Sequence, residues 1–550
     1  MAALRIIFFV VIWQSFLVLI GQCNSCAEEY ELAIKCNSFS DLFSYPDPEK
    51  LTSVTISHND SGNKTEDVFI CDEPLFEKFK SVSFLTFTNA RVLHISDDCF
   101  SGMSSIRAID IQRNELTSIN MEAFRATDDP QIQAIFLNSN HIVAIDFSGI
   151  TFPELTQFEA YFNRIKFVKL KTENLPKVSN MYLGGNHISR FSIESQSMQK
   201  LDLSENRIKS FKGTDLILPN LFLIYLNDNH LTTITPNMLE NMPNLESLYL
   251  AHNLLHTVSL PNLKKTSYMD FRYNRIKSMD KIDLTALEKN YAILFDSNKV
   301  FQMENQPPFE NLISFTCSSC YIHIIDPFFF SETFKKLESI SITSNFLTTA
   351  NIFQKRTDHD FKLTDVTLSY NKIKRITNRD FIHLTKLTHL SLDNNDISSI
   401  APGSFDKLEN LNSLSISNNV LFQVSSNLFS KTTGLHVLSL SGNNMPFFDI
   451  PGWNKQTGEI VEKNTALNKL QLLNIYNNPL QCECIDLLQS WATKHNIFVR
   501  TTDRLAMNGV KPVCIVNEAG CQAVGKDFIK DYWHLFNDAK INDILAEEEE

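Results

Sequence analysis

Residues 387–421 read LTHLSLDNNDISSIAPGSFDKLENLNSLSISNNVL, and this stretch contains one pattern twice. The pattern is L-x-x-L-x-L-x-x-N-x-L. It is set first by Leu387, Leu390, Leu392, Asn395 and Ile397, and 24 positions later by Leu411, Leu414, Ile416, Asn419 and Leu421. A fixed period of 20–30 residues indicates a solenoid, in which each repeat buries its apolar side against its neighbours. The stretch therefore decides the fold class.

The same pattern extends along most of the 550 residues when the chain is aligned on the asparagine position, which we call the anchor. Most steps between anchors are 20–26 residues, with longer steps of 31 after Asn59 and 35 after Asn443. We predict a repeat array over residues 51–481. Its eighteen anchors are Asn59, Ala90, Asn114, Asn140, Asn163, Asn186, Asn206, Asn229, Asn253, Asn274, Asn298, Cys320, Asn345, Asn371, Asn395, Asn419, Asn443 and Asn478.

Each column of the pattern has a physical reason. The alternating leucines predict a short strand with every second side chain pointing inward, and stacked strands predict a parallel sheet. The anchor amide can hydrogen-bond backbone groups that the turn would otherwise bury unpaired. A second apolar column lies ten residues after the anchor and should fill the outer wall: Phe100, Phe124, Phe330, Phe381, Phe405 and Phe429. These columns predict an α/β fold, a curved horseshoe solenoid with its sheet on the concave face.

The array and its flanking cysteines resemble the extracellular leucine-rich repeat family, including secreted invertebrate immune and carrier-type members. The segment Asn478-Pro479-Leu480-Gln481-Cys482-Glu483-Cys484 is similar to the start of that family's C-terminal cysteine-rich cap, with Cys514 and Cys521 further on. The resemblance implies Cys482–Cys514 and Cys484–Cys521 bridges. Because Cys514 and Cys521 are only seven residues apart, closer than is usual in the family, the pairing order stays open.

The resemblance also implies an N-terminal cap with Cys26 and Cys36. We therefore expect caps over residues 24–50 and 482–521, followed by an acidic tail over 522–550 whose apolar spacing is compatible with a helix. Cys71 and Cys99 lie on the convex segments of adjacent early repeats, where a bridge would brace the 31-residue step. Bridged and free forms of this pair both stay open.

Cys317 and Cys320 occupy a leucine column and the anchor column, so both should point into the solenoid. Two readings are open for this C-x-x-C pair. It is a redox or metal pair, or it is two buried thiols that pack as small hydrophobic side chains. We favour the buried thiols.

The first 23 residues have the order of a secretory signal peptide. Arg5 precedes the apolar run 6–20, and small residues follow, so we expect cleavage near Cys23. A retained signal anchor is the alternative. Loss of Cys23 would leave ten of the 11 cysteines, an even number that suits an oxidising compartment. No later stretch reaches the ~18 apolar residues of a membrane span, and we expect a secreted, extracellular protein.

Composition and motifs argue against several functions. With 50 Lys and Arg against 63 Asp and Glu, and no basic run, nucleic acid is not expected as a partner. No phosphate-binding glycine loop, nucleophile elbow or zinc-binding helix motif occurs, so we expect no enzyme, no cofactor and no metal site. Asp358-His359-Asp360 is interpreted as a solvated loop. Asn63 is the better glycosylation acceptor, because the other sequon, Asn59, is also an anchor.

The outward strand position, four residues before each anchor, changes character along the chain. In the later repeats it is hydroxylic: Thr316, Ser341, Thr367, Ser391, Ser415 and Ser439. In the earlier repeats it is aromatic and acidic, and flanking residues extend it. The predicted ligand-binding residues of this concave face are Asp110, Phe136, Glu159, Tyr161, Tyr182, Asp202, Tyr225, Tyr249, Tyr268, Asp270 and Arg272.

Aromatic side chains and arginine concentrate at interface hot spots, and carboxylates favour a basic partner. Tyrosine is also simply a good strand residue, which is the alternative reading. We favour a secreted scaffold that binds a protein ligand, in innate immunity or extracellular signalling as the family resemblance implies. The second hypothesis is an adhesion or assembly protein that forms homo- or hetero-oligomers through its tail or through the serine–threonine part of the strand column.

Overall fold

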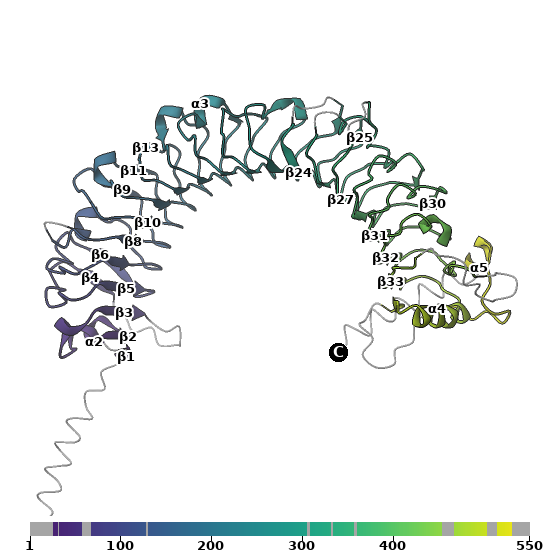
Figure 1. The fold of residues 1–550 in the computed structure, drawn as a ribbon. Helices are drawn as coiled ribbons and strands as arrows, with labels where there is room; N and C mark the ends of the chain where they lie inside the picture. Colours follow the sequence, from purple (N-terminus) through teal and green to yellow (C-terminus); the bar gives the residue numbers. More distant parts are fainter. Residues whose placement is uncertain are drawn as a thin grey trace, which may run out of the picture. The chain divides into compact units, whose positions relative to one another are not determined.

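The computed structural model describes residues 26–30, 32–57, 68–127, 130–304, 309–331, 334–356, 360–453, 467–502 and 514–530. The chain divides into two compact units. Unit 1 runs to Thr232 and includes Pro236–Tyr249, and unit 2 comprises Thr233–Thr235 and Leu250 onward. Within each unit, short parallel strands line the inner side of the stack (Figure 1). The predicted leucine-rich repeat solenoid of about 18 turns is confirmed.

Unit 1 begins with an antiparallel hairpin of β1 (Ala27–Tyr30) and β2 (Ala33–Cys36), and β2 starts the parallel sheet. The middle residue of each three-residue strand of this sheet in unit 1 is buried, as the leucine columns predict. The further strands of this sheet are β3 (Ser53–Ser57), β5 (Phe84–Thr88), β7 (Ala108–Asp110), β8 (Ala134–Phe136), β10 (Gln157–Glu159), β12 (Asn180–Tyr182), β14 (Lys200–Asp202), β16 (Leu223–Tyr225) and β18 (Ser247–Tyr249).

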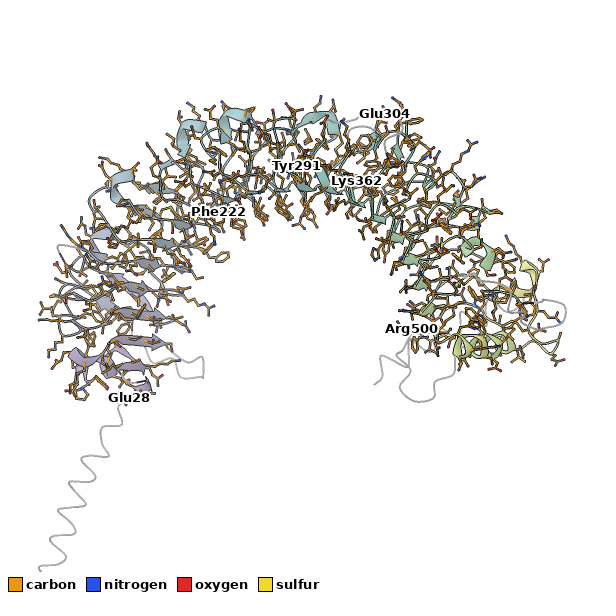
Figure 2. The ribbon with its side chains drawn as sticks, viewed as in Figure 1. Glu28, Phe222, Tyr291, Glu304, Lys362 and Arg500 are labelled. Atoms are coloured by element: carbon orange, nitrogen blue, oxygen red, sulfur yellow. A yellow bond between two sulfur atoms is a disulfide. The ribbon has the colours of Figure 1, made fainter. Side chains whose placement is uncertain are left out.

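Unit 2 repeats the arrangement. Its parallel strands are β20 (Tyr268–Asp270), β22 (Tyr291–Leu294), β24 (Leu312–Thr316), β26 (Ser339–Ser341), β27 (Asp365–Thr367), β29 (His389–Ser391), β31 (Ser413–Ser415), β32 (Val437–Ser439), β33 (Leu472–Asn474) and β34 (Phe498–Arg500). Figure 2 labels Tyr291 and Arg500 on this sheet. Tyr291 is 1% exposed, and its burial raises the pKa of the phenol.

The outer side carries small strand pairs and single helical turns. In unit 1 these are β4 (Phe69–Cys71) with β6 (Val92–Ile95), β9 (Ala144–Asp146) with β11 (Phe167–Lys169), β13 (Ile193–Glu194) with β15 (Leu216–Ile217), η2 (Met121–Phe124), η3 (Thr172–Asn174), η4 (Gly213–Asp215) and α3 (Pro236–Leu239). In unit 2 they are β17 (Thr233–Ile234), β19 (Thr257–Ser259) and β21 (Ile282–Asp283), β23 (Gln302–Met303) with β25 (Ile324–Ile325), β28 (Arg375–Ile376) with β30 (Ser399–Ile400), η5 (Met279–Lys281) and η6 (Ser426–Phe429).

The phenylalanine column fills the space beneath this outer wall. All six predicted rings are buried, and neighbours in the column stack on one another. The ring centroids of Phe100 and Phe124 are 6.0 Å apart, and those of Phe405 and Phe429 are 6.2 Å apart. Where rings occupy the column in adjacent repeats, they pack against one another and join those repeats along the outer side.

The anchor asparagines form a hydrogen-bonded ladder. The Asn186 Oδ1 accepts the backbone N–H of Ile165 at 2.9 Å, and its Nδ2 donates to the carbonyls of Ala160 and Leu183, both at 2.9 Å. The residue before the anchor, Gly185, has a positive φ of 68°. An anchor asparagine of this kind satisfies buried backbone groups of its own repeat and of the preceding one, which the turn leaves unpaired.

The left-handed position before the anchor is filled mostly by residues with side chains. Phe162 (φ 52°), Glu205 (φ 50°) and Tyr273 (φ 55°) occupy it, although a side chain makes this conformation unfavourable. The ladder hydrogen bonds of the following asparagine compensate for that cost. The local backbone is therefore held by the anchor and does not need glycine.

Cysteine pairs close both ends. Disulfides join Cys26 to Cys36 and Cys71 to Cys99 in unit 1. In unit 2 they join Cys482 to Cys514 and Cys484 to Cys521, the pairing that the family resemblance implies. The N-terminal elements are α2 (Phe39–Phe43) and η1 (Pro48–Lys50), and the C-terminal ones are α4 (Cys482–Lys494), which buries Leu488 and Trp491, and α5 (Lys526–Lys530).

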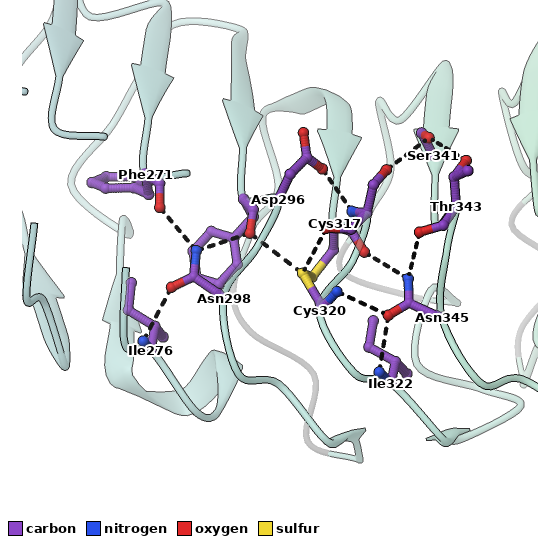
Figure 3. Close-up of a disulfide and its surroundings, with 12 residues drawn as sticks. Phe271, Ile276, Asp296, Asn298, Cys317, Cys320, Ile322, Ser341, Thr343 and Asn345 are labelled. Atoms are coloured by element: carbon purple, nitrogen blue, oxygen red, sulfur yellow. Dashed lines mark hydrogen bonds between the residues drawn. A yellow bond between two sulfur atoms is a disulfide. The ribbon is translucent and has the colours of Figure 1, made fainter. Parts of the chain in front are cut away.

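The expectation of free thiols at Cys317 and Cys320 was wrong. The two residues form a disulfide, although both are fully buried as the columns predict. The left-handed turn at Ser319 (φ 54°) brings their Cα atoms to 5.7 Å, which is within the range that a disulfide spans. Figure 3 shows the bridge between two regular ladder members, Asn298 and Asn345.

Several sequence predictions concern residues outside the described ranges. These are the signal peptide, both sequons (Asn59 and Asn63), Asp358 and His359 of the charged loop, and the tail beyond Lys530. The proposed domain boundaries also stay predictions. Among the helices of the described ranges, none is long and apolar enough to cross a membrane.

The ladder makes a prediction for Asn186→Ala. Removal of the amide leaves the buried Ile165 N–H unpaired and takes one hydrogen bond from each of two carbonyls, which still accept from Asn163 and Asn206. We expect a loss of about 1–3 kcal/mol in the free energy of unfolding. Urea unfolding monitored by circular dichroism measures this loss. The matched control is Asn262→Ala, at an exposed asparagine, which should change stability by less than about 0.5 kcal/mol. Equal losses would contradict the role of the ladder.

A second prediction concerns the one late repeat whose anchor is cysteine. The Val300 N–H, which an anchor asparagine would accept, has no hydrogen-bond partner among the described residues, and Val300 is fully buried. We compare Cys317→Leu/Cys320→Asn with Cys317→Leu/Cys320→Ala, two variants that both lack the disulfide. The asparagine variant should be more stable by about 2 kcal/mol, because its amide accepts the Val300 N–H. Equal unfolding midpoints would show that the ladder stops at this repeat.

Candidate recognition surface

The predicted binding residues of unit 1 lie side by side on its parallel sheet. Asp110, Phe136, Glu159, Tyr182, Asp202, Tyr225 and Tyr249 each end a strand, and the register pairs them from strand to strand. We call this surface, together with Tyr161, the strand face of unit 1. All but Asp202 are partly exposed. The strand period places these side chains on one face because each occupies the same position of its repeat.

Tyr161 spans a whole repeat on this face. Its hydroxyl donates to Asp202 Oδ2 at 2.8 Å, and Asp202 belongs to the second repeat further along. The ring crosses Gly184, where an added Cβ would lie 2.9 Å from the ring atom Cε1. Such a contact is closer than carbon atoms approach, so glycine is needed here for the ring to lie flat. Burial and the Asp202 carboxylate raise the pKa of the Tyr161 phenol.

The tyrosines form two stacked pairs. The rings of Tyr161 and Tyr182 are 5.6 Å apart between centroids, and those of Tyr225 and Tyr249 are 4.6 Å apart. Burial raises the pKa of Tyr182 and Tyr225, so both phenols are neutral at physiological pH. The pairs present ring surface and hydroxyl groups whose orientation is already set by the neighbouring ring.

The carboxylates of the strand face are engaged in hydrogen bonds within the protein. Asp202 is only 8% exposed, and its Oδ1 accepts the N–H and the hydroxyl of Ser204 at 2.8 and 2.6 Å. Glu159 accepts hydrogen bonds from Asn138 Nδ2 at 2.8 Å and Gln157 Nε2 at 2.6 Å. These two acids therefore fix the orientation of the polar side chains around them.

Asp110 lies at the edge of the same network. It accepts the Gln112 N–H at 3.0 Å and the Gln112 side-chain amide at 2.8 Å. Burial raises the pKa of Asp110, and the two hydrogen bonds from Gln112 oppose that rise. Asn138 also donates to Gln112 Oε1 at 3.2 Å, which links Asp110 to Glu159 through two amides.

Tyr268, Asp270 and Arg272 belong to unit 2. Asp270 is 1% exposed, and Arg272 donates to it through Nε at 3.0 Å and Nη2 at 2.7 Å. That hydrogen bond raises the pKa of the guanidinium. The Asp270 carboxylate is thus enclosed, while the Arg272 side chain remains 41% exposed.

The hydroxylic column of unit 2 is also internally bonded. Ser369 and Ser391 are 2.7 Å apart between hydroxyl oxygens, and Asp393 accepts the hydroxyls of Ser391 at 3.0 Å and Ser415 at 2.6 Å. Its small side chains offer no aromatic group to a partner.

The sequence reasoning missed the residues that support the site. Gln112, Asn138 and Gly184 all lie two residues before an anchor, a column that was not considered on its own. It also missed an exposed aromatic group on the turn side of unit 2, in which Tyr321 and His323 each stack on Phe346, at 6.3 and 4.8 Å. The group could have been found in the sequence, because Tyr321 and Phe346 are the first residues after two successive anchors.

No three His, Cys, Asp or Glu side chains gather to hold a metal ion within the described ranges. The arrangement of the strand face is suited to contact with another surface. It contains stacked aromatic rings, and its side-chain amides already form hydrogen bonds within the protein. Proteins built on this repeat are generally binding scaffolds without enzymatic activity.

Known proteins match the chain in its repeats. The profile of the leucine rich repeat family matches residues 81–142, 196–255, 361–397 and 386–445. Keratocan of Danio rerio is 22% identical over 203 residues, which cover 35% of this chain and 52% of keratocan. The chain thus spans about half the length of that curated relative.

Solved structures share the fold. The Toll–Spatzle complex of Drosophila contains a chain that matches with a TM-score of 0.52 at 14% identity, covering 88% of this chain and 68% of that one. A leucine-rich repeat protein of Leptospira interrogans matches with a TM-score of 0.43 at 16% identity, covering 87% and 97%. At these identities the Toll match shows the fold alone.

The Tyr161 hydroxyl predicts a pH dependence. Its pKa is higher in the folded than in the unfolded protein, so folding favours the neutral phenol. The stabilising contribution is complete below the ordinary pKa of 10 and is lost as the pH rises above it. Urea unfolding between pH 9 and pH 12 should show a shallower loss of stability for Tyr161→Phe than for the wild type. Parallel pH profiles would contradict the assignment.

Proposed function

We propose that this chain, a member of the leucine-rich repeat family, is a secreted scaffold that binds a protein ligand through the strand face of unit 1. The observation that carries the proposal is the presence of two stacked tyrosine pairs, Tyr161–Tyr182 and Tyr225–Tyr249, on the strand face. Tyrosine is enriched at the energetic centres of protein interfaces, because it supplies a large contact area and a hydroxyl at low entropic cost.

The rigidity of the tyrosines supports the proposal. A side chain that is already ordered before binding loses less entropy when the partner arrives. Tyr161 is ordered by Asp202 and by Gly184 beneath it, and Tyr225 by its stack with Tyr249. The buried Asp202 strengthens this order, so we assign it a positioning role. We assign the contact with the ligand to the tyrosine rings.

The same chemistry describes the partner. It should present apolar side chains that fit between the ring pairs, with donors such as arginine or lysine that reach the phenol oxygens and the partly exposed Glu159. Secretion is part of the proposal and is supported by the five disulfides, which suit an oxidising compartment. A role in innate immunity or extracellular signalling extends the proposal on the family resemblance.

The test compares two triple variants. In Tyr182→Ala/Tyr225→Ala/Tyr249→Ala the anchors are removed, and in Thr367→Ala/Ser391→Ala/Ser415→Ala the same strand positions change on the hydroxylic column. Immobilised wild-type protein captures ligands from extracellular fluid, and a ligand identified by mass spectrometry is then purified and its affinity measured for each variant. The tyrosine variant should bind at least about 30-fold more weakly, since a hot-spot residue contributes 2 kcal/mol or more.

The control variant should bind within about twofold of the wild type. Equal binding by all three proteins would move the ligand site away from the strand face. Equal loss in both variants would show that the hydroxylic column is part of the site, and would contradict the division between the two surfaces.

A further inference from the structure

Basic side chains gather on the turn side of unit 1, beside the anchors. The sequence contains no basic run, because these residues are 2 to 24 positions apart along the chain. The repeat geometry brings them together at the first, third and fourth positions after successive anchors. They are Arg164, Lys166, Arg190, Arg207 and Lys209, with His141, His187 and His230 in the first of these positions. We call this set the basic stripe.

Backbone hydrogen bonds place the stripe in consecutive repeats. The N–H of Arg164 donates to Ile142 O at 2.9 Å, that of His187 to Ile165 O at 2.9 Å, and that of Arg207 to Ile188 O at 2.8 Å. Each step is therefore one repeat, about 5 Å from strand to strand. The first position after the anchor is occupied by Glu115 in the repeat of Asn114 and by His141 in the next repeat. The stripe therefore begins at His141.

The five Lys and Arg side chains of the stripe are exposed, and none forms an ion pair with an acidic side chain in the described part of the chain. Some other exposed lysines of unit 1 are paired, whereas Lys78, Lys80 and Lys212, like the stripe, form no ion pair in the described part of the chain. Lys169 lies 2.9 Å from Asp146, and Lys177 lies 2.6 Å from Glu154. The acidic residues nearest in sequence are Glu205, two residues before Arg207, and Glu194, four residues after Arg190.

The stripe places five unpaired cations in three consecutive repeats of a chain whose net charge is −13. Like charges held close together repel one another, and the repulsion is relieved when an anion binds. A row with a regular step and no enclosing pocket fits a linear polyanion better than a small anion, because several charges are neutralised at once and their counterions are released together.

We propose that the basic stripe binds a sulfated glycan chain. The choice among linear polyanions rests on the extracellular location included in the proposed function, since sulfated glycans are the abundant polyanions of that compartment. Two exposed rings flank the stripe, Phe162 at 56% and Phe167 at 50%, and their faces suit the apolar faces of sugar rings. The cations of the stripe lie on the turn side and the tyrosine pairs on the strand face, and Phe162, whose ring centroid is 6.1 Å from that of Tyr161, lies between the two.

The test uses heparin, with the full-length secreted protein, at physiological salt. The variant Arg164→Ser/Arg207→Ser/Lys209→Ser should bind heparin at least tenfold more weakly than the wild type. The slope of log affinity against log salt should fall by roughly one for each contacting residue removed. The matched control is Lys372→Ser/Lys374→Ser/Arg375→Ser, which removes the same charge from the equivalent positions of a single repeat in unit 2 and should change affinity by less than twofold.

Thermal unfolding midpoints and capture of the protein ligand report on the fold of both variants, and both should match the wild type. Three outcomes would overturn the proposal. They are no heparin binding by the wild type, equal weakening by the control variant, and equal or tighter binding of single-stranded DNA or polyglutamate, which would assign the stripe to nucleic acid or to an acidic protein. Failure of the tyrosine variant to lose its ligand would contradict the proposed function without changing any of these readouts.

Discussion

The ladder of anchor amides is the interaction on which the rest of the structure depends. Each repeat turns sharply after its strand, and the turn buries backbone groups that water cannot reach. One asparagine side chain satisfies an N–H of the preceding repeat and carbonyls of both. Because the amide connects two repeats, the same bonds that complete a turn also set the distance to the next strand and the register of the sheet.

The ladder and its leucine columns are the part of the fold that could be predicted from sequence, since a fixed period of residue types determines which side chains lie inside. Features that depart from the period were harder to predict from the sequence. Cys320 was placed correctly in the core, but its bond to Cys317 was missed. The bond depends on the left-handed turn before the anchor, here at Ser319, which brings the two Cα atoms to 5.7 Å, a distance that residue types alone do not give. Likewise, the outward position of Asp202 was predicted, whereas its burial beneath Tyr161 required the side-chain geometry.

The two surfaces of unit 1 differ in the way the fold creates them. On the strand face, residues of similar chemistry occupy one column, so the sequence alone identified the tyrosines. On the turn side, the cations are distributed over three positions of each repeat, so they do not form a basic run in the sequence. The stacking of repeats turns this dispersed charge into a row. A solenoid can therefore carry two separate surfaces on one set of repeats, one on the strands and one on the turns.

The hydrogen bond between Tyr161 and Asp202 has a consequence for cooperativity. In a simple solenoid each repeat interacts only with its immediate neighbours, and the array behaves as a one-dimensional chain of coupled units. The Tyr161 side chain passes over the repeat of Asn186 and holds the repeat beyond it. The repeat of Asn186 cannot open without breaking the Tyr161–Asp202 hydrogen bond, although it contributes neither partner. This coupling between next-nearest neighbours should join three repeats into one folding unit in the middle of the tyrosine surface.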